Sequence, residues 1–243
     1  MNESTQFEHE RAMAIEQLGG DLDLRRLSLQ WMVAADKYKY SYIFSWLGRP
    51  IIKLPGDIAV LQEVIWQTKP DLIVETGIAH GGSLILSASI LELIGNGDVL
   101  GIDIEIRPHN RSAIESHQLS HRIQMLEGSS TDPQVIEDVA RIASTKKSVM
   151  VILDSMHTHK HVLDELYIYS QFVTVGAHLI LPDTFIEYFP KGYYQNRPWD
   201  VGDNPMTAMR QFLSETDCFE IDTRFSNKAL ISEAIDGYLL RVK

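Results

Sequence analysis

The chain has 243 residues, 44% of them hydrophobic and 23% charged, which is the composition of a globular protein with a full core. Its 33 acidic residues outnumber its 22 lysines and arginines, and the net charge of −11 argues against nucleic acid as a partner, because phosphate contacts need a basic face. Cys218 is the only cysteine, so the sequence excludes an intramolecular disulfide and a cysteine metal cluster.

The first residues, MNESTQFEHER, are polar and acidic and lack the apolar region of a secretory signal. Apolar runs such as Val149–Leu153 are far shorter than the roughly 20 residues that a helix needs to cross a bilayer. We therefore expect a cytoplasmic protein that does not insert into a membrane.

The amino-terminal part, up to about residue 70, has helix-like spacing of its apolar residues and no strand alternation. One helix is predicted around Leu27–Tyr40. A second is predicted over Asp57–Gln67, with Asp57 as its N-cap. Leu54-Pro55-Gly56 is expected to break the chain between them.

From residue 71 onward, short apolar runs alternate with helical segments. Strands are predicted at Leu72–Val74, Asp98–Ile104, Ile123–Leu126, Val149–Leu153 and His178–Leu181. Helices are predicted at Ser83–Leu93, Val135–Ala143 and Val162–Phe172. Continuous apolar strands joined by helices indicate a parallel sheet buried on both faces, and hence a doubly wound, Rossmann-like α/β fold.

The carboxyl-terminal part follows another pattern. Two strand-like runs, Phe219–Thr223 and Gly237–Val242, are separated by Asn227-Lys228 and by no evident crossover helix. Such a pair is predicted to be antiparallel and to form a hairpin at the edge of the sheet. A parallel sheet that ends in an antiparallel hairpin resembles the class I methyltransferases.

The first informative strand end reads VETGIAHGGS (74–83), and ligands of open α/β sheets bind beyond such ends. Glu75 ends the strand, Gly77 permits a tight turn, and Gly81 and Gly82 would let a ligand approach the backbone. A plain glycine turn between a strand and a helix explains these residues about equally well, because the G-x-G-x-x-G pattern is absent.

Two further strand ends carry polar residues suited to a nucleoside. Asp103 lies 26 residues after Gly77, where an acid can accept hydrogen bonds from both hydroxyls of a ribose. Ser129 and Ser130 follow the next strand and could face an adenine ring. Helix capping is the alternative explanation for each of these residues. Together, Glu75 and Asp103 favour a nucleoside ligand more than either does alone.

Two aspartates end the next two strands. Asp154 and Asp183 are expected to project into one crevice, where a divalent cation would relieve the repulsion between their carboxylates. Oxygen ligands at a site open to water favour Mg²⁺ over zinc. The alternative is that each aspartate only caps the helix that follows.

Three histidines follow Asp154 at alternate positions, and that spacing does not bring all of them to one face of a helix. A zinc site is therefore not expected. His157 is closest to the strand end and is the candidate catalytic base. The H-x-D/E pair of the iron triad occurs nowhere in the sequence.

The segment 191–200 is rich in aromatic residues and is followed by Gly202, Asn204 and Pro205. Tyr194 and Trp199, with Tyr193, could stack on a sugar or ring, while Arg197 and Asn196 could bind its hydroxyls. A contact between subunits would use the same residue types, and we expect a homo-oligomer.

In their order along the chain, these motifs resemble the cephalosporin hydroxylase family. The resemblance covers about residues 40–243 and rests on LPGD, VETGIAHGGS, LDSMHTHKHVLDEL, RPWDVGDNP and NKALIS…DGYLLR. Despite its name, the family has an S-adenosylmethionine methyltransferase fold and includes Mg²⁺-dependent sugar O-methyltransferases. The resemblance implies that residues 61–243 form a catalytic domain behind a helical region, 1–60. The acceptor it implies is a hydroxyl of a polysaccharide, glycolipid or glycosylated natural product.

The resemblance also implies roles for individual residues. Those implied to line the S-adenosylmethionine site are Glu75, Gly77, Gly81, Ser83 and Asp103. Asp154 and Asp183 are implied to hold Mg²⁺, with His157 near the acceptor hydroxyl to take its proton.

This chain departs from the family pattern at the second metal position. Some members carry two adjacent acids there, where this chain has Pro182-Asp183, and Glu187 is a substitute that we do not favour. The other functions considered are an oxidative tailoring enzyme and a non-catalytic nucleoside-binding partner.

Overall fold

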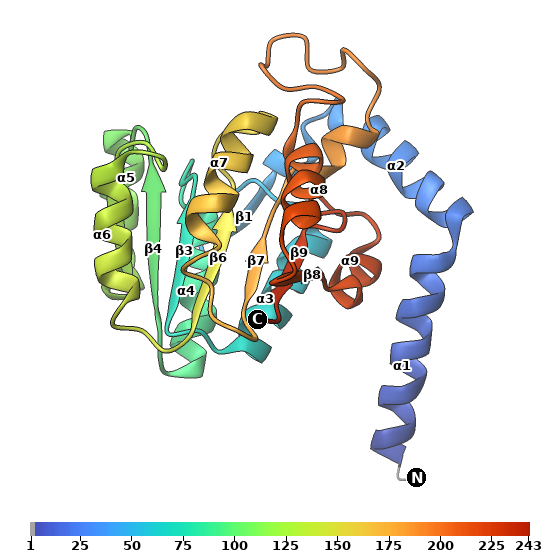
Figure 1. The fold of residues 1–243 in the computed structure, drawn as a ribbon, viewed down its shortest axis with the longest axis horizontal. Coiled ribbons are helices and arrows are strands. Elements are labelled where there is room, and N and C mark those ends of the chain that lie inside the picture. Colours follow the sequence, from blue (N-terminus) through green and yellow to red (C-terminus); the bar gives the residue numbers. More distant parts are fainter. Residues whose placement is uncertain (1–2) are drawn as a thin grey trace.

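The computed structural model describes residues 3–243, which form a sheet between two layers of helices (Figure 1). Its strand order is β5-β4-β3-β6-β7-β9-β8. The strands are β3 (Leu72–Thr76), β4 (Asp98–Asp103), β5 (Ile123–Glu127), β6 (Val149–Leu153), β7 (His178–Ile180), β8 (Phe219–Ile221) and β9 (Tyr238–Arg241). Neighbours from β5 to β7 pair in parallel, whereas β9 is antiparallel to both β7 and β8. The predicted fold is confirmed.

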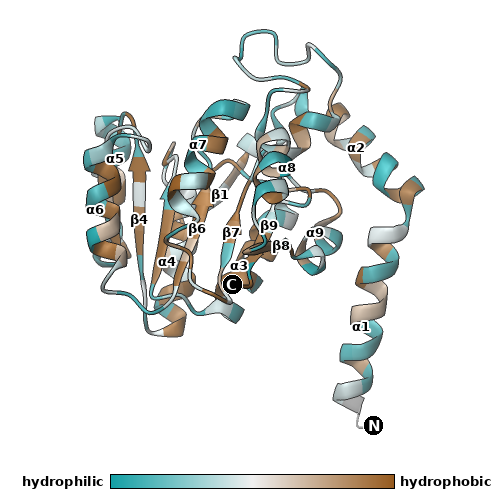
Figure 2. Ribbon diagram, in the orientation of Figure 1, coloured by the Kyte–Doolittle hydropathy of each residue, from teal (hydrophilic) through white to brown (hydrophobic). Residues whose placement is uncertain are grey.

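Helices cover both faces of this sheet. One face packs against α3 (Pro55–Thr68), α4 (Gly82–Ile94), α5 (Pro108–Glu115) and α9 (Thr223–Ala229). The other packs against α6 (Pro133–Ala143), α7 (His159–Tyr169) and α8 (Pro205–Glu215). Side chains alternate between the two cores, as Ile73 and Val74 do on β3, because successive residues of a strand point to opposite faces. Figure 2 shows the apolar residues gathered in the sheet and on the inner sides of the helices.

The five predicted parallel strands match the observed ones to within two residues, and the three predicted helices that join them to within three. The reason is visible in β3 and β6, whose residues are all buried. A strand buried on both faces is a continuous apolar run, the strongest sequence signal that a strand gives. Across residues 3–243, no helix combines the length and the hydropathy needed to span a bilayer.

The amino-terminal part begins with α1 (Glu3–Gly20) and α2 (Leu22–Asp36), and Figure 1 shows α1 extending beside the body of the molecule. The helix predicted at Leu27–Tyr40 therefore starts and ends earlier than expected. The absence of strands there was a wrong prediction, because β1 (Phe44–Trp46) and β2 (Arg49–Ile51) form a small hairpin. A division of the chain at residue 60 stays a prediction.

Two local predictions are wrong. Asp57 is not the N-cap of its helix, since α3 starts two residues earlier, at Pro55, a residue suited to a first turn. The Asp57 carboxylate is buried and accepts hydrogen bonds from the Ser232 hydroxyl (2.5 Å) and the Glu233 N–H (2.8 Å). The second error is the missing helix between the last two strands: α9 lies there, and β8 and β9 are nevertheless antiparallel.

Candidate functional site

A cavity of about 640 Å³ opens at the carboxyl ends of β3, β6 and β7. It is lined by the β3–α4 turn, by the segment after β6, and by the long connection that follows β7. Eleven of the residues selected from the sequence line it: Glu75, Gly77, Gly82, Ser83, Asp154, His157, Asp183, Tyr193, Tyr194, Arg197 and Trp199. The long connection begins with a 3-10 helix, η3 (Thr184–Tyr188).

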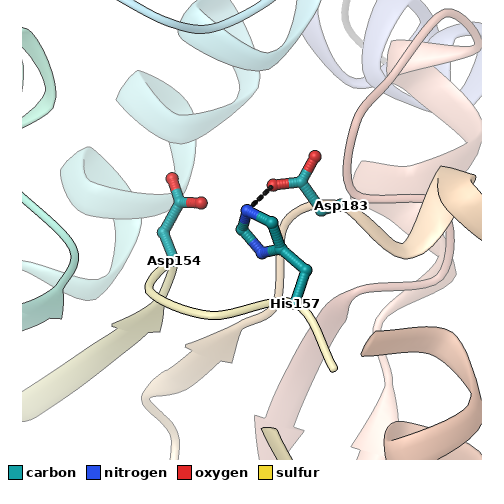
Figure 3. A group of neighbouring side chains, drawn as sticks. All are labelled: Asp154, His157 and Asp183. Carbon is teal, nitrogen blue, oxygen red and sulfur yellow. Dashed lines mark ion pairs between the residues drawn. The ribbon is translucent and has the colours of Figure 1, made fainter. Parts of the chain in front are cut away.

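Three side chains on one wall of this cavity lie close enough together to hold a cation. One ligand atom each of Asp154, His157 and Asp183 lies within 4.8 Å of the other two, and the His157 Nε2 is 3.3 Å from an Asp183 oxygen (Figure 3). Burial and the Asp154 charge raise the pKa of Asp183, and the His157 charge lowers it. Two facing carboxylates with an imidazole are a donor set that fits a divalent cation.

The backbone at Asp183 is itself unusual. Its φ is 59°, in the left-handed region that residues with a side chain seldom adopt. Such a conformation costs of order 1–3 kcal/mol and is retained where the surroundings impose it, most often at functional sites. The conformation turns the chain from β7 into η3 and leaves the carboxylate beside His157.

Lys53, which the sequence analysis missed, adds a positive charge to the same wall. Its ammonium donates to the Asp154 Oδ2 at 3.2 Å, and the residue is 4% exposed. Burial disfavours the charged ammonium, but the charges of Asp154, Glu233 and Glu75 outweigh it and raise the pKa of Lys53. The available signal was a single charged residue inside the apolar run of residues 51–54.

Glu75 and Ser83 bring polar atoms into the cavity without satisfying them. Glu75 is 1% exposed, and its Oε2 has no hydrogen-bond partner within the described part of the chain. The Ser83 hydroxyl is near enough to the Glu75 carboxylate to lower its pKa, but it makes no hydrogen bond of ordinary geometry there. Burial raises the pKa of Glu75 to about 7, although the Lys53 charge opposes that shift. Buried polar atoms normally have partners, so these two indicate a site for a polar ligand.

A second hollow, of about 160 Å³, adjoins the cavity, and both are lined by Gly77 and Ser155. Asp103, Ser129 and Ser130, the residues that the sequence suggested for a nucleoside, line it together. The Asp103 Oδ2 already accepts from the backbone N–H groups of residues 78 and 79, at 2.8 and 3.2 Å. These two donors fill the lone pairs of Oδ2, and Oδ1 accepts from the Glu105 N–H at 3.2 Å, so Asp103 fixes the glycine turn and retains one lone pair of Oδ1 for a ligand.

The glycines of the turn have different reasons for being glycine. Gly77 has φ 90°, and a Cβ there would lie 1.9 Å from the Asp154 carbonyl oxygen. Gly81 has φ 82° and packs against Ile114, and it lines neither hollow. The expected approach of a ligand to Gly81 therefore stays a prediction, and the packing of Ile114 explains the glycine without it.

The three histidines after Asp154 go to different places, as expected from their spacing. His157 lines the cavity. His159 contacts Thr207 (2.9 Å) on α8, and His161 lies 3.3 Å from the Ser130 hydroxyl.

Aromatic residues form a wall of the same cavity beside His157. Trp199 packs edge-on against His157, with ring centroids 4.6 Å apart, and the Arg197 guanidinium lies over the Trp199 ring at 5.2 Å. Tyr194 continues this wall and stacks on Phe189 with ring centroids 6.0 Å apart. The predicted substrate residues therefore lie beside the candidate base.

Comparison with known proteins agrees with this geometry. The family model described as "Rhamnosyl O-methyltransferase/CmcI" matches residues 38–242. The chain belongs to this family. Among its curated relatives, the rhamnosyl O-methyltransferase of Mycobacterium tuberculosis is 27% identical over 203 residues, or 81% of this chain and 78% of the relative. That of Mycobacterium leprae is 28% identical over 200 residues, or 81% and 82% of the two chains.

Solved structures with the same fold include CmcI and a second protein. A structure of CmcI with Mg and SAM superposes with a TM-score of 0.58 at 21% identity, covering 83% of this chain and 78% of CmcI. A putative O-methyltransferase from Klebsiella pneumoniae gives a TM-score of 0.51 at 16% identity, covering 79% and 80% of the two chains. At these identities the likeness establishes the fold alone.

Pro182, directly before Asp183, has no side-chain atom that could bind a cation. The substitute considered from the sequence, Glu187, does not lie with the other ligands: its Oε2 accepts from the Asn204 amide (2.6 Å) and the Gly202 N–H (2.8 Å). Among the described residues, the third group that reaches the two aspartates is His157.

Proposed function

We propose that this member of the rhamnosyl O-methyltransferase/CmcI family transfers a methyl group from S-adenosylmethionine to a hydroxyl of a sugar, with the help of Mg²⁺. The observation that carries the proposal is the placement of Asp154, His157 and Asp183 on the cavity into which the glycine turn of β3 opens. Its curated relatives are named rhamnosyl O-methyltransferases, and a CmcI structure of the same fold contains Mg and SAM.

The two adjoining hollows would bind the two ends of the methyl donor. Asp103, Ser129 and Ser130 line the smaller one and would bind the nucleoside, with the Asp103 Oδ1 accepting from a ribose hydroxyl. The unsatisfied oxygens of Glu75 and Ser83 fit the polar remainder of the molecule in the larger one. Gly77, which lines both, lies where the two hollows adjoin.

The cation would be held by Asp154 and Asp183. When bound, Mg²⁺ supplies positive charge that lowers the pKa of an acceptor hydroxyl. His157 would accept the proton of that hydroxyl, which requires a neutral imidazole within hydrogen-bond reach. Asp183 on one side and the edge-on Trp199 ring on the other hold the orientation of this imidazole. Held orientation is worth several orders of magnitude in rate, because the reacting groups need not be brought together in each turnover.

The acceptor class follows from the aromatic wall. Aromatic faces stack on the C–H faces of a sugar, and the Arg197 guanidinium offers donors to its hydroxyls. Tyr194, Arg197 and Trp199 thus fit a saccharide or a glycosylated natural product. A homo-oligomeric state and a cytoplasmic location remain predictions.

Calorimetric titration with S-adenosylmethionine and S-adenosylhomocysteine, each in Mg²⁺ and in EDTA, tests the proposal first. We expect micromolar binding of both that survives EDTA, because the cation is placed at the acceptor. Isotope-labelled S-adenosylmethionine and a panel of sugars, rhamnosides included, then test methyl transfer. Absence of cofactor binding, or binding without transfer to any sugar hydroxyl, would contradict the proposal.

A further inference from the structure

Lys53 is the one buried lysine or arginine among residues 4–243. It lies between β2 and α3, in a segment that does not belong to the seven-stranded sheet. It reaches the cavity because β2 packs directly on the turn that opens α4: a Cβ on Gly82 would lie 2.2 Å from the Pro50 carbonyl oxygen. The fold thus brings a buried ammonium to the glycine turn of the cofactor site.

The contacts of this ammonium leave donors unused. An ammonium has three N–H donors, and the hydrogen bond that Lys53 makes is the one to Asp154. Asp57, which also attracts Lys53, already accepts from Ser232 and Glu233. A buried ammonium with spare donors is costly unless a ligand supplies acceptors.

Glu75, which lines the same cavity, has an oxygen that lacks a hydrogen-bond donor. Its Oε2 is buried without a hydrogen-bond partner in the described chain, and Lys53 and Glu75 attract one another. A cation with spare donors and an anion with a spare acceptor, both lining one cavity, match a ligand group that carries both charges. An α-amino acid is such a group, with a carboxylate and an ammonium on one carbon.

We propose that Lys53 is a further cofactor-binding residue, which binds the carboxylate of the amino-acid end of the methyl donor while Glu75 binds its ammonium. This inference rests on the proposed function, since it requires an adenosyl amino acid in the cavity. The competing explanation is that Lys53 only neutralises Asp154 and supports the fold.

The two explanations separate when ligands with and without the amino-acid end are compared. S-Adenosylhomocysteine carries that end, decarboxylated S-adenosylhomocysteine lacks its carboxylate, and 5′-methylthioadenosine lacks the end altogether. Lys53→Met should weaken S-adenosylhomocysteine about 10- to 100-fold in calorimetry, the loss expected for a hydrogen bond between charged groups. It should leave the affinities for the other two ligands within about threefold of their values in the unaltered protein.

Lys146→Met is the matched control, because it also removes a partly buried lysine–aspartate pair, with Asp98 at 2.8 Å, but at the amino ends of the strands. It should change none of the three affinities. Glu75→Gln should weaken the two ligands that carry the ammonium and spare 5′-methylthioadenosine. Lys53→Arg should keep part of the selectivity that Lys53→Met loses, since guanidinium also binds carboxylates.

Two results would overturn the inference. The first is that Lys53→Met lowers the affinities for all three ligands alike, as a structural role predicts. The second is that it leaves the affinity for S-adenosylhomocysteine unchanged. If the unaltered protein binds neither S-adenosylhomocysteine nor 5′-methylthioadenosine, the proposed function itself is wrong and the inference falls with it. Binding of 5′-methylthioadenosine by the Lys53→Met variant also verifies that the variant is folded.

Discussion

The Lys53 ammonium lies 3.2 Å from the Asp154 carboxylate, although 101 residues separate them in the sequence. The Lys53 side chain is 5% exposed and that of Asp154 23% exposed, so the pair is closed on the lysine side and open to the cavity on the aspartate side. Asp154 therefore has a fixed partner and still presents an oxygen to the cavity. The pair links the segment before α3 to the end of β6.

Asp154→Asn should lower methyl transfer more than roughly 100-fold, because second-sphere changes at metal sites already cost 10- to 100-fold and this change removes a ligand itself. The affinity for S-adenosylhomocysteine should stay within about threefold, since the amide oxygen can still accept from Lys53. Labelled methyl transfer and calorimetry measure the two effects. Asp164→Asn, an exposed change on α7, is the control and should retain activity. Full activity of the Asp154 variant would reject the metal role.

Glu75 should make the ligand-free protein less stable as the pH rises. Its pKa is raised from 4.5 in the unfolded chain to about 7 in the fold, so the folded state binds the proton more tightly. This contribution is fully present below about pH 4.5 and is lost as the pH rises through about 7; the loss is about 3 kcal/mol. Urea unfolding at pH 4.5 and pH 8 measures it.

The comparison with Glu75→Gln isolates this residue from the other titrating groups. The quantity to compare is the unfolding free energy of the variant minus that of the unaltered protein. This difference should be about 3 kcal/mol larger at pH 8 than at pH 4.5, because glutamine does not ionise. An unchanged difference between the two proteins at both pH values would show that Glu75 has an ordinary pKa.

Sequence and structure agree where the signal is local. The strands at Leu72–Thr76 and Val149–Leu153 were predictable because burial on both faces requires apolar residues at every position. The approach of Asp154 to Asp183 was predictable for a topological reason: β6 and β7 are parallel neighbours, so their carboxyl ends meet.

The features that the sequence did not predict mostly depend on contacts between segments far apart in the chain. Lys53 enters the site through the packing of β2 on Gly82, which no local pattern encodes. Aspartate is a common helix N-cap, but the hydrogen-bond partners of Asp57 are Ser232 and Glu233, about 175 residues away. The helix α9 was missed because seven residues are too few to show a helical period clearly.

Asp222 should be important for stability but not for the site. It caps α9 and is 6% exposed, and it accepts from His178 (3.2 Å) and from the Arg224 guanidinium (2.6 Å). Burial raises the pKa of Asp222, but these hydrogen bonds outweigh burial and hold the pKa below its usual range. Asp222→Ala should cost about 3 kcal/mol of unfolding free energy at pH 7, because it leaves His178 buried without its partner.

Urea denaturation measures this cost, and Glu220→Ala on the exposed side of β8 is the control, expected to change stability by less than about 0.5 kcal/mol. The contribution of Asp222 is present above its unfolded-state pKa of about 3.8 and is lost as the pH falls through the lower folded-state pKa. Equal stability of the two alanine variants at pH 7 would contradict the prediction.

Trp199→Ala should affect the acceptor and leave the cofactor unaffected. Loss of the ring removes stacking on the sugar and the edge contact to His157, and aromatic contacts are worth about 0.5–1.5 kcal/mol beyond their buried area. We expect KM for the sugar to rise roughly 10-fold, with the affinity for S-adenosylhomocysteine unchanged. For Trp199→Phe, KM for the sugar should lie between the values of the unaltered protein and of Trp199→Ala. A lowered cofactor affinity would place Trp199 in the other half of the site.

Gly77→Ala should disturb both halves of the site at once. The added Cβ would lie 1.9 Å from the Asp154 carbonyl oxygen, so either the glycine turn or the end of β6 must move. The turn lines the cofactor hollow and the end of β6 carries a cation ligand. We therefore expect weaker binding of both S-adenosylhomocysteine and Mg²⁺, and a loss of stability larger than that from backbone strain alone.

Gly95→Ala is the control that measures the cost of backbone strain without a collision. Gly95 has φ 83°, close to the 90° of Gly77, but nothing lies within 4 Å of a Cβ added there. Its substitution should cost about 1–2 kcal/mol, the penalty of a left-handed alanine, and leave both affinities unchanged. Urea denaturation and calorimetry of the two variants then separate strain from collision. If Gly77→Ala and Gly95→Ala lose the same stability and bind S-adenosylhomocysteine and Mg²⁺ equally well, the turn and the end of β6 do not constrain each other.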